Sequence, residues 1–215
     1  MAWHSHIIRN EPIAASLREA KDQYLAADAP IILTLIWVVT AVFAVEVALS
    51  VLFGTRSIRV LATGSFKLHP ELAWLVAPFL HAGIGHLIVN IGGLAVVGIP
   101  LEQYFSKRRF GIFIVVTAYL STFTGGLTQA VFTTDQVAMY GISGVVYAMG
   151  GFGLVHFGSS NDSLPSFEWV ALMFSLGAGV IVAFDPFTGP YFHPDWINGG
   201  HTSGFLIGVI AGMAR

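Results

Sequence analysis

Six long apolar stretches dominate this sequence of 215 residues. A helix needs about 20 consecutive apolar residues to cross the bilayer core, and about 17 to 25 are tolerated. Charged residues make up only 10% of the chain, whereas soluble domains carry about 25%. The chain therefore has too few polar side chains to cover a water-exposed surface, and it is predicted to be an all-α membrane protein with six transmembrane helices. The expected spans are residues 31–53, 77–99, 110–132, 142–158, 167–184 and 199–215.

The basic residues predict how this bundle is oriented. Cytoplasmic loops of membrane proteins carry an excess of Lys and Arg. If both termini are cytoplasmic, seven of the ten Lys and Arg residues lie inside, including the run Lys107-Arg108-Arg109, and three lie outside. We therefore expect both termini in the cytoplasm, in a multi-pass protein of the cell membrane.

The first 29 residues differ in composition from the rest of the chain. They are too polar for the apolar core of a signal peptide, so we expect no cleaved signal. Ile13, Leu17, Ala20 and Tyr24 recur at helical spacing, which predicts a short helix lying on the membrane surface. We therefore divide the chain into a cytoplasmic amino-terminal segment, residues 1–29, and a six-span domain, residues 30–215.

Several function classes are disfavoured by what the sequence lacks. A formal net charge of −2 does not indicate a nucleic-acid partner. The absence of cysteine removes disulfides, thiolate metal sites and a cysteine nucleophile. There is no HExxH motif, and His81 and His86 are five residues apart, on different helical faces. An aspartyl protease would need two intramembrane aspartates, and the spans offer only Asp185 at an edge. We expect neither a metal nor another cofactor.

Polar residues inside the spans are the candidates for function, because burying them in a bilayer is costly. In the second span His86 and Asn90 are four residues apart, and Gly93 follows on the same helical face. In the fourth span Ser143 and Tyr147 share a face in the same way. Each of these two spans is therefore expected to present hydrogen-bonding groups toward the bundle interior.

The sixth span carries a histidine at its start and a ladder of glycines. His201 shares a face with the ladder formed by Gly200, Gly204 and Gly208. Small residues at this spacing let two helix backbones approach closely, and the glycine-rich fourth span, which contains Gly144, is the natural partner.

Ser143 and His201 are predicted to lie at the same depth. Both fall within about a turn of the outer end of spans that run in the same direction. A serine in a membrane helix ordinarily bonds back to a carbonyl one turn earlier, and a glycine ladder alone ordinarily serves packing. The combination instead predicts a serine hydroxyl and an imidazole within hydrogen-bond reach, the arrangement that nucleophilic catalysis requires.

These residues resemble the rhomboid family of intramembrane serine proteases. Four features carry the resemblance, in the family's order and on the expected spans. They are His86-Leu-Ile-Val-Asn90 preceded by His81, the acidic Glu102, the nucleophile motif Gly141-Ile142-Ser143-Gly144, and Gly200-His201 followed by Gly204 and Gly208. Residues 30–215 would then be a six-span, rhomboid-like catalytic domain.

The resemblance implies a role for each candidate residue. Ser143 would be the nucleophile and His201 its general base. His86, Asn90 and the backbone N–H of Ser143 would form an oxyanion site, supported by Gly141. Tyr147 would pack against the His201 ring. Four glycines would allow close helix packing: Gly144, Gly200, Gly204 and Gly208.

Such a protease would cut transmembrane proteins within or near the lipid bilayer, with the fifth span and its loops admitting substrate and water. Where the family often has a Trp-Arg pair in the first outer loop, this chain reads Glu71-Leu72-Ala73-Trp74, which puts a lipid-anchoring role of that loop in doubt. The dyad needs no third charge, so Asp195 is a weak candidate, and Glu46 is expected to face the bundle or the outer interface.

Two other functions remain open at this point. A rhomboid-like pseudoprotease would bind or escort membrane-protein clients, but such proteins typically lack the serine or the histidine. A small transporter would have interrupted helices near the midplane, whereas the polar residues here gather toward one side.

Overall fold

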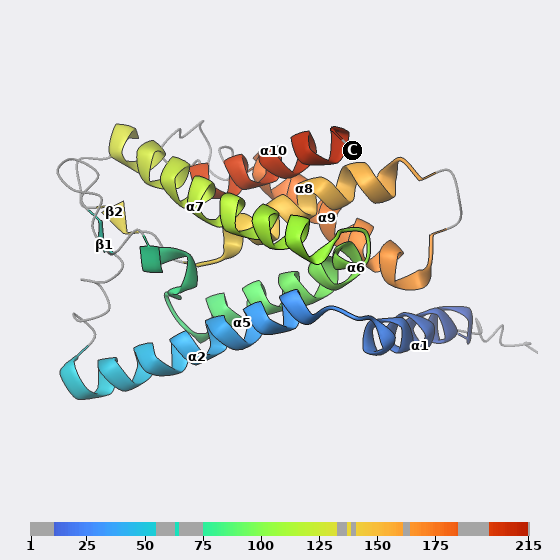
Figure 1. The fold of residues 1–215 in the computed structure, drawn as a ribbon, viewed down its shortest axis with the longest axis horizontal. Helices are drawn as coiled ribbons and strands as arrows, with labels where there is room; N and C mark the ends of the chain where they lie inside the picture. The colour runs from blue at the N-terminus through green and yellow to red at the C-terminus, as the bar shows by residue number, and fades with distance from the viewer. Residues whose placement is uncertain are drawn as a thin grey trace, which may run out of the picture.

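The computed structural model describes residues 11–54, 63–64, 75–132, 137–138, 141–160, 164–184 and 198–214. They form a bundle of long helices (Figure 1), with two strands of two residues each that pair antiparallel. The helices and strands are α1 (Glu11–Ala26), α2 (Pro30–Phe53), β1 (Thr63–Gly64), the 3-10 turn η1 (Ala77–Phe79), α5 (Ile84–Gly93), the π-helical segment η2 (Leu94–Gly98), α6 (Ile99–Glu102), α7 (Lys107–Phe132), β2 (Val137–Ala138), α8 (Ser143–Gly158), α9 (Ser166–Phe184) and α10 (Gly199–Met213).

Four helical segments within the described residues are long and apolar enough to cross a membrane. They are Pro30–Phe53, Ile84–Glu102, Lys107–Thr128 and Ser166–Phe184. The protein is therefore a multi-pass membrane protein built almost entirely of helices. The other two predicted spans coincide with α8 and α10, which have 16 and 15 residues. The count of six spans and the cytoplasmic position of the termini stay predictions.

The second span differs from its predicted bounds. It was expected at residues 77–99, but the helix begins at Ile84, after η1 and a short turn, and continues through η2 to Glu102. The break has a local cause. The backbone N–H of His81 donates to the carboxylate of Glu46, with N–O distances of 3.1 and 3.2 Å, instead of to a carbonyl one turn earlier.

Helix α8 is the centre of the bundle, and ten of its 16 residues are buried. It packs against α7, α9 and α10. A helix that is apolar all round, as α8 is, has no face suited to water and belongs inside. By contrast, α2 buries only Ile32, Leu35, Val39 and Glu46. Helix α8, which begins at Ser143, therefore lies in the interior of the bundle.

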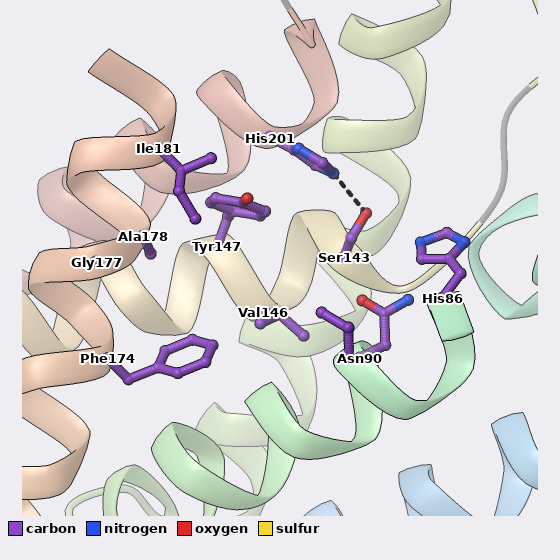
Figure 2. Close-up of a pocket in the computed structure, with 11 residues that line it drawn as sticks. His86, Asn90, Ser143, Val146, Tyr147, Phe174, Gly177, Ala178, Ile181 and His201 are labelled. Atoms are coloured by element: carbon purple, nitrogen blue, oxygen red, sulfur yellow. Dashed lines mark hydrogen bonds between the residues drawn. The ribbon is translucent and has the colours of Figure 1, made fainter. Parts of the chain in front are cut away.

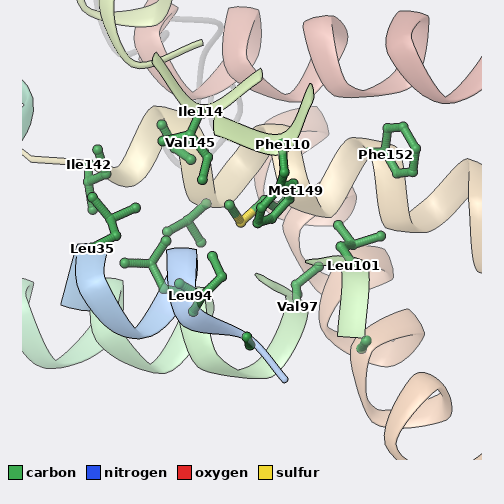
Figure 3. Close-up of a cluster of buried hydrophobic side chains, with 14 of the residues drawn as sticks. Leu35, Leu94, Val97, Leu101, Phe110, Ile114, Ile142, Val145, Met149 and Phe152 are labelled. Atoms are coloured by element: carbon green, nitrogen blue, oxygen red, sulfur yellow. The ribbon is translucent and has the colours of Figure 1, made fainter. Parts of the chain in front are cut away.

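The main hydrophobic core lies at the meeting point of α2, the α5–α6 segment, α7 and α8 (Figure 3). Leu94, Phe110, Val145 and Met149 are each fully buried there. Side chains of four elements interdigitate at this point, so the core fixes where α8 stands relative to its neighbours.

Glu102 holds the amino-terminal end of α2. Its carboxylate accepts the backbone N–H groups of Ile31 at 3.1 Å and Ile32 at 2.9 Å. The first N–H groups of a helix have no partner within the helix, and Glu102 supplies one from 70 residues away. The Lys107 ammonium lies 3.1 Å from the same carboxylate and 3.3 Å from that of Asp28. The starts of α2 and α7 therefore lie at one end of the bundle.

Helix α1 forms where the sequence predicted a helix. It lies beyond the amino-terminal end of α2, near the start of α9 (Figure 1). Ala20 is buried and Tyr24 packs on Phe167, whereas Ile13 and Leu17 are 66% and 60% exposed. Its position on a membrane surface stays a prediction.

Candidate active site

Ser143 and His201 are in direct contact. The Ser143 hydroxyl oxygen lies 3.0 Å from Nε2 of His201 (Figure 2). Ser143 is the first residue of α8 and His201 the third of α10. Both lie in the first turn of their helices. The Ser143 backbone N–H stands at the start of α8, where an N–H has no acceptor within the helix itself.

Close packing of α8 and α10 creates this contact. A Cβ added at Gly204 would meet the backbone of Gly144, and one added at Gly208 would meet the carbonyl of Ala148. The carbonyl of Gly200 would lie 3.5 Å from a Cβ at Gly144. The ladder of small residues thus lets the two backbones touch, as such ladders do in membranes.

The ring of His201 is held on one face by Tyr147. The two rings are stacked, with centroids 4.2 Å apart and an interplanar angle of 19°. Tyr147 lies one helical turn after Ser143 on α8, so the helix that presents the hydroxyl also orients the imidazole that contacts it.

Asn198 adds two contacts that the sequence analysis did not assign. Its side-chain oxygen accepts the backbone N–H of His201 at 3.1 Å, which caps α10. Its Nδ2 lies 3.4 Å from Nε2 of His201. Asparagine three residues before the histidine is a helix-capping signal visible in the sequence, but the contact with the ring requires the side-chain geometry.

His86 and Asn90 come from α5 and lie beside the loop that leads into α8 (Figure 2). That loop passes them at Gly141, whose φ of +94° is in the left-handed region. A Cβ at Gly141 would stand 2.7 Å from the His86 ring and 3.2 Å from Nδ2 of Asn90. Glycine is therefore required on both conformational and steric grounds. Its backbone N–H donates to the carbonyl of Ala77 at 3.0 Å, which fixes the loop.

Asn90 is buried, and its Nδ2 finds no acceptor among the described residues. An unpaired buried donor is costly, and this one borders the cavity beside Ser143. Among the described residues, the site thus holds an amide donor beside the serine that has no acceptor.

A second group of polar residues, around Glu46, supports α5. Glu46 is only 3% exposed, so it faces the bundle, and its carboxylate holds the backbone of His81. The rings of His81 and His86 have centroids 5.2 Å apart. The sequence analysis gave Glu46 no partner, because the two residues are 35 positions apart.

A cavity of about 290 Å³ adjoins Ser143 and His201. Its walls are mostly apolar and come from α5, α8 and α9, as Figure 2 shows. Helix α9 contributes Phe174, Gly177, Ala178 and Ile181. The site therefore has an apolar cavity directly beside the serine hydroxyl.

The family model described as "Rhomboid domain" matches residues 71–215. The chain belongs to the rhomboid family. The motif Gly141-Ile142-Ser143-Gly144, the helix that carries His201 and the His86–Asn90 pair all lie within the matched residues, and the helical bundle is consistent with a rhomboid membrane protein.

The chain is similar to several rhomboid proteins of eukaryotes. It is 28% identical to RHOMBOID-like protein 1 of Arabidopsis thaliana over 151 residues, 68% of this chain and 36% of that protein. It is 27% identical to Rhomboid-related protein 3 of Homo sapiens over 69% of this chain and 39% of that protein. A shorter match, 35% identical over 78 residues, is to Inactive RHOMBOID-like protein 8 of Arabidopsis thaliana and covers 34% of this chain and 21% of that protein. The matches thus span less than half of each relative.

Some sequence-based expectations concern residues outside those that the structure describes. They are the third-charge candidate Asp195, the segment Glu71-Leu72-Ala73-Trp74 and the first ten residues.

Proposed function

We propose that this rhomboid protein is a serine endopeptidase that hydrolyses peptide bonds of transmembrane proteins. The contact of 3.0 Å between the Ser143 hydroxyl and His201 is the observation that carries the proposal. A serine with a purely structural role bonds to its own helix, as Ser175 does to the carbonyl of Ala171 at 2.8 Å. Ser143 instead reaches an imidazole on another helix.

In the proposed reaction the Ser143 oxygen attacks the scissile carbonyl while Nε2 of His201 takes the hydroxyl proton. The carbonyl oxygen becomes an oxyanion, which accepts hydrogen bonds from the Ser143 backbone N–H, the Asn90 amide and His86. His201 then gives its proton to the leaving amine, and an ester to Ser143 remains. Water, deprotonated by His201, hydrolyses this ester and restores the serine.

The positions of these groups favour catalysis in two further ways. Ser143 begins α8, so the positive end of the helix dipole lies next to the developing negative charge. The apolar cavity lowers the local dielectric constant, which strengthens each hydrogen bond to the oxyanion. Tyr147 restricts the His201 ring, so little reorientation is needed when the proton moves.

The cavity also supports a transmembrane protein as the substrate. Its α9 wall is apolar, which suits the side chains of a membrane-spanning segment better than those of a soluble peptide. Four helical segments are long and apolar enough to cross a membrane, which supports a site that works within the lipid bilayer. We infer no cofactor, because serine, histidine and amide groups supply the acid–base and electrostatic steps.

A pseudoprotease that binds membrane-protein clients is the competing function, and one relative is named as inactive. A fluorophosphonate probe separates the two functions because it reacts only with an activated serine. We expect labelling of the wild type and of Ser175→Ala, together with cleavage of a transmembrane reporter, and neither in Ser143→Ala or His201→Ala. Labelling that persists in Ser143→Ala, or a folded wild type that neither labels nor cleaves, would overturn the proposal.

We further propose that the protein crosses the cell membrane six times, with both termini in the cytoplasm. Residues 1–29 are then the cytoplasmic amino-terminal segment. Lys107, Arg108 and Arg109 lie at the α1 end of the bundle, which supports this orientation. The chain has no cysteine, so single cysteines report cleanly. An impermeant maleimide should label Phe53→Cys from outside intact cells and Arg108→Cys only after permeabilisation; the reverse pattern would invert the topology.

A further inference from the structure

Helix α7 presents a row of hydroxyl side chains to α8 and α10, the helices that it packs against (Figure 1). Ser121, Thr124 and Thr128 are three and four residues apart, so they lie on one face of α7. Each of the three hydroxyls donates to a carbonyl of α7 itself, at 3.1, 2.9 and 2.8 Å. A hydroxyl oxygen can also accept a hydrogen bond, so this face of α7 can still bind a donor from a neighbouring helix.

Thr124 receives such a donor from α10. Its hydroxyl oxygen is in hydrogen-bond contact with the hydroxyl oxygen of Ser203. The proton of Thr124 is already engaged, because the Leu120 carbonyl lies 2.9 Å from its oxygen. The other acceptor near Ser203 is the carbonyl of Gly200, at a longer distance of 3.3 Å. Ser203 therefore donates to Thr124, and this bond joins α10 to α7 across 79 positions of the sequence.

A second contact with α7 lies one helical turn earlier on α10. A Cβ added at Gly199 would stand 2.1 Å from the hydroxyl oxygen of Thr128 and 3.1 Å from the carbonyl oxygen of Thr124. Gly199 and Ser203 are four residues apart and so share a face of α10. His201 is midway between them, roughly half a turn around the helix axis from each. The side of α10 that contacts α7 is thus opposite the side that carries the imidazole.

The contact between α10 and α8 leaves a need for such a bond. It is made by glycines, and added Cβ atoms at Gly204 and Gly208 would meet the backbone of α8. Backbone contact of this kind sets how far apart two helices are, but glycines have no side chains to interlock against rotation. A helix with its side chains has a radius of about 5–6 Å, so a rotation of about 10° moves a ring at its surface by about 1 Å. A displacement of that size is costly for catalysis.

We propose that Ser203, through its bond to Thr124, is a positioning residue for His201. The bond fixes the rotation of α10 about its own axis, so that Nε2 of His201 points at the Ser143 hydroxyl. The inference rests on the proposed protease function. Neither Ser203 nor Thr124 is among the residues that line the cavity, so both act through α10 and not through contact with substrate.

The first test measures turnover of a transmembrane reporter by the full chain. Ser203→Ala and Thr124→Val each remove the bond, and each should lower kcat about threefold to tenfold, the range for one interhelical hydrogen bond in a membrane. KM should stay that of the wild type, because the cavity is untouched. The double variant should be no slower than either single variant, since all three lose the same bond. Thr124→Ser keeps the hydroxyl and should retain the wild-type kcat.

Thr122→Val is the matched control on α7. Thr122 is buried, and its hydroxyl donates within its own helix, to the carbonyl of Ala118 at 2.8 Å. This variant should change the unfolding temperature about as much as Thr124→Val does, but it should leave kcat unchanged. An equal loss of kcat in Thr122→Val, or effects of Ser203→Ala and Thr124→Val that multiply in the double variant, would show that the bond only stabilises the fold, and the proposal would be wrong.

The second test observes the His201 ring without using activity. The Tyr147 ring is stacked on it, with centroids 4.2 Å apart (Figure 2), so its ring current shifts the proton resonances of His201. These resonances are measured by NMR in histidine-labelled protein in detergent micelles and assigned by their loss in His201→Gln. We expect Ser203→Ala and Thr124→Val to move them in the same direction, and Thr122→Val to leave them at the wild-type positions.

The two tests distinguish failure of this inference from failure of the protease function. His201 resonances that stay in place in both Ser203→Ala and Thr124→Val would show that the ring does not depend on the bond, and this would overturn the inference. Moved resonances in a chain that neither cleaves the reporter nor reacts with a fluorophosphonate would instead contradict the protease function and leave the positioning of His201 by Ser203 standing.

Discussion

Asn198 and His201 contact each other through both backbone and side chain. The Asn198 oxygen accepts the His201 backbone N–H at 3.1 Å, and this bond identifies which end of the amide is oxygen. Nδ2 must then be the atom that lies 3.4 Å from Nε2 of His201. An N–H donor aimed at Nε2 favours the tautomer in which Nε2 is an acceptor, as a general base requires.

Substitutions of Asn198 should therefore separate its role as the cap of α10 from its effect on the His201 imidazole. Asn198→Asp keeps a capping oxygen but puts a carboxylate near the ring, where it favours the protonated imidazole. We expect the acidic limb of the pH profile of kcat/KM to move to higher pH. Asn198→Ser, which caps but does not reach the ring, should retain the wild-type unfolding temperature and lower kcat about threefold to tenfold, the range for one hydrogen bond. Identical pH profiles for Asn198→Asp and Asn198→Ser would show that Asn198 only caps α10.

The unpaired amide of Asn90 gives a second prediction. In the proposed mechanism its Nδ2 gains an acceptor only when the oxyanion forms, so Asn90→Ala should lower kcat by about 10²–10³ with little change in KM. His86→Ala should act in the same direction. Ile88→Ala, at an exposed position of the same helix, is the control and should behave as wild type. A rise in KM with unchanged kcat would assign Asn90 to substrate binding instead.

Close contact between α8 and α10 predicts a strong effect at Gly204. A Cβ there would stand 3.0 Å from the Gly144 carbonyl carbon and 3.2 Å from its Cα, and backbone atoms cannot move aside cheaply. Gly204→Ala should lower the free energy of unfolding by about 1–3 kcal/mol. It should also reduce turnover about 10²-fold, because displacing His201 from Ser143 by even 1 Å is costly.

Gly111→Ala is the matched control on α7, where an added Cβ meets nothing within 4 Å. It should be neutral or slightly stabilising, because alanine favours helix. Equal effects of the two substitutions on unfolding would contradict a packing role for Gly204.

The sequence alone predicted the features that depend on the spacing of residues close together in the chain. Apolar run length predicted the positions of most helices. The spacing of Ser143, Tyr147, His201 and Gly204 predicted that the serine hydroxyl and the imidazole lie within hydrogen-bond reach. These depend on helical periodicity, which acts over a few residues.

Features that depend on contacts between distant segments were not predicted. The start of α5 at Ile84 depends on Glu46 accepting the His81 N–H, and the docking of α1 depends on Gln23 reaching Phe167. Neither pair has a sequence motif, because any acceptor at the right place in space satisfies a free backbone N–H. The amphipathic pattern of α1 was compatible equally with lipid and with the bundle.

The last prediction concerns Glu46. Its carboxylate accepts the backbone N–H of His81, in the turn that precedes α5. Glu46→Gln keeps an acceptor oxygen, so the unfolding free energy should change by less than about 1 kcal/mol. Glu46→Ala leaves the buried His81 N–H without a partner, which should cost about 1–3 kcal/mol. Since the turn leads directly into the helix carrying His86 and Asn90, Glu46→Ala should also lower kcat more than KM. Val47→Ala, on the exposed side of α2, should leave both quantities unchanged. A loss in Glu46→Gln as large as in Glu46→Ala would mean that the charge of Glu46, and not its hydrogen bonds to His81, holds this part of the site.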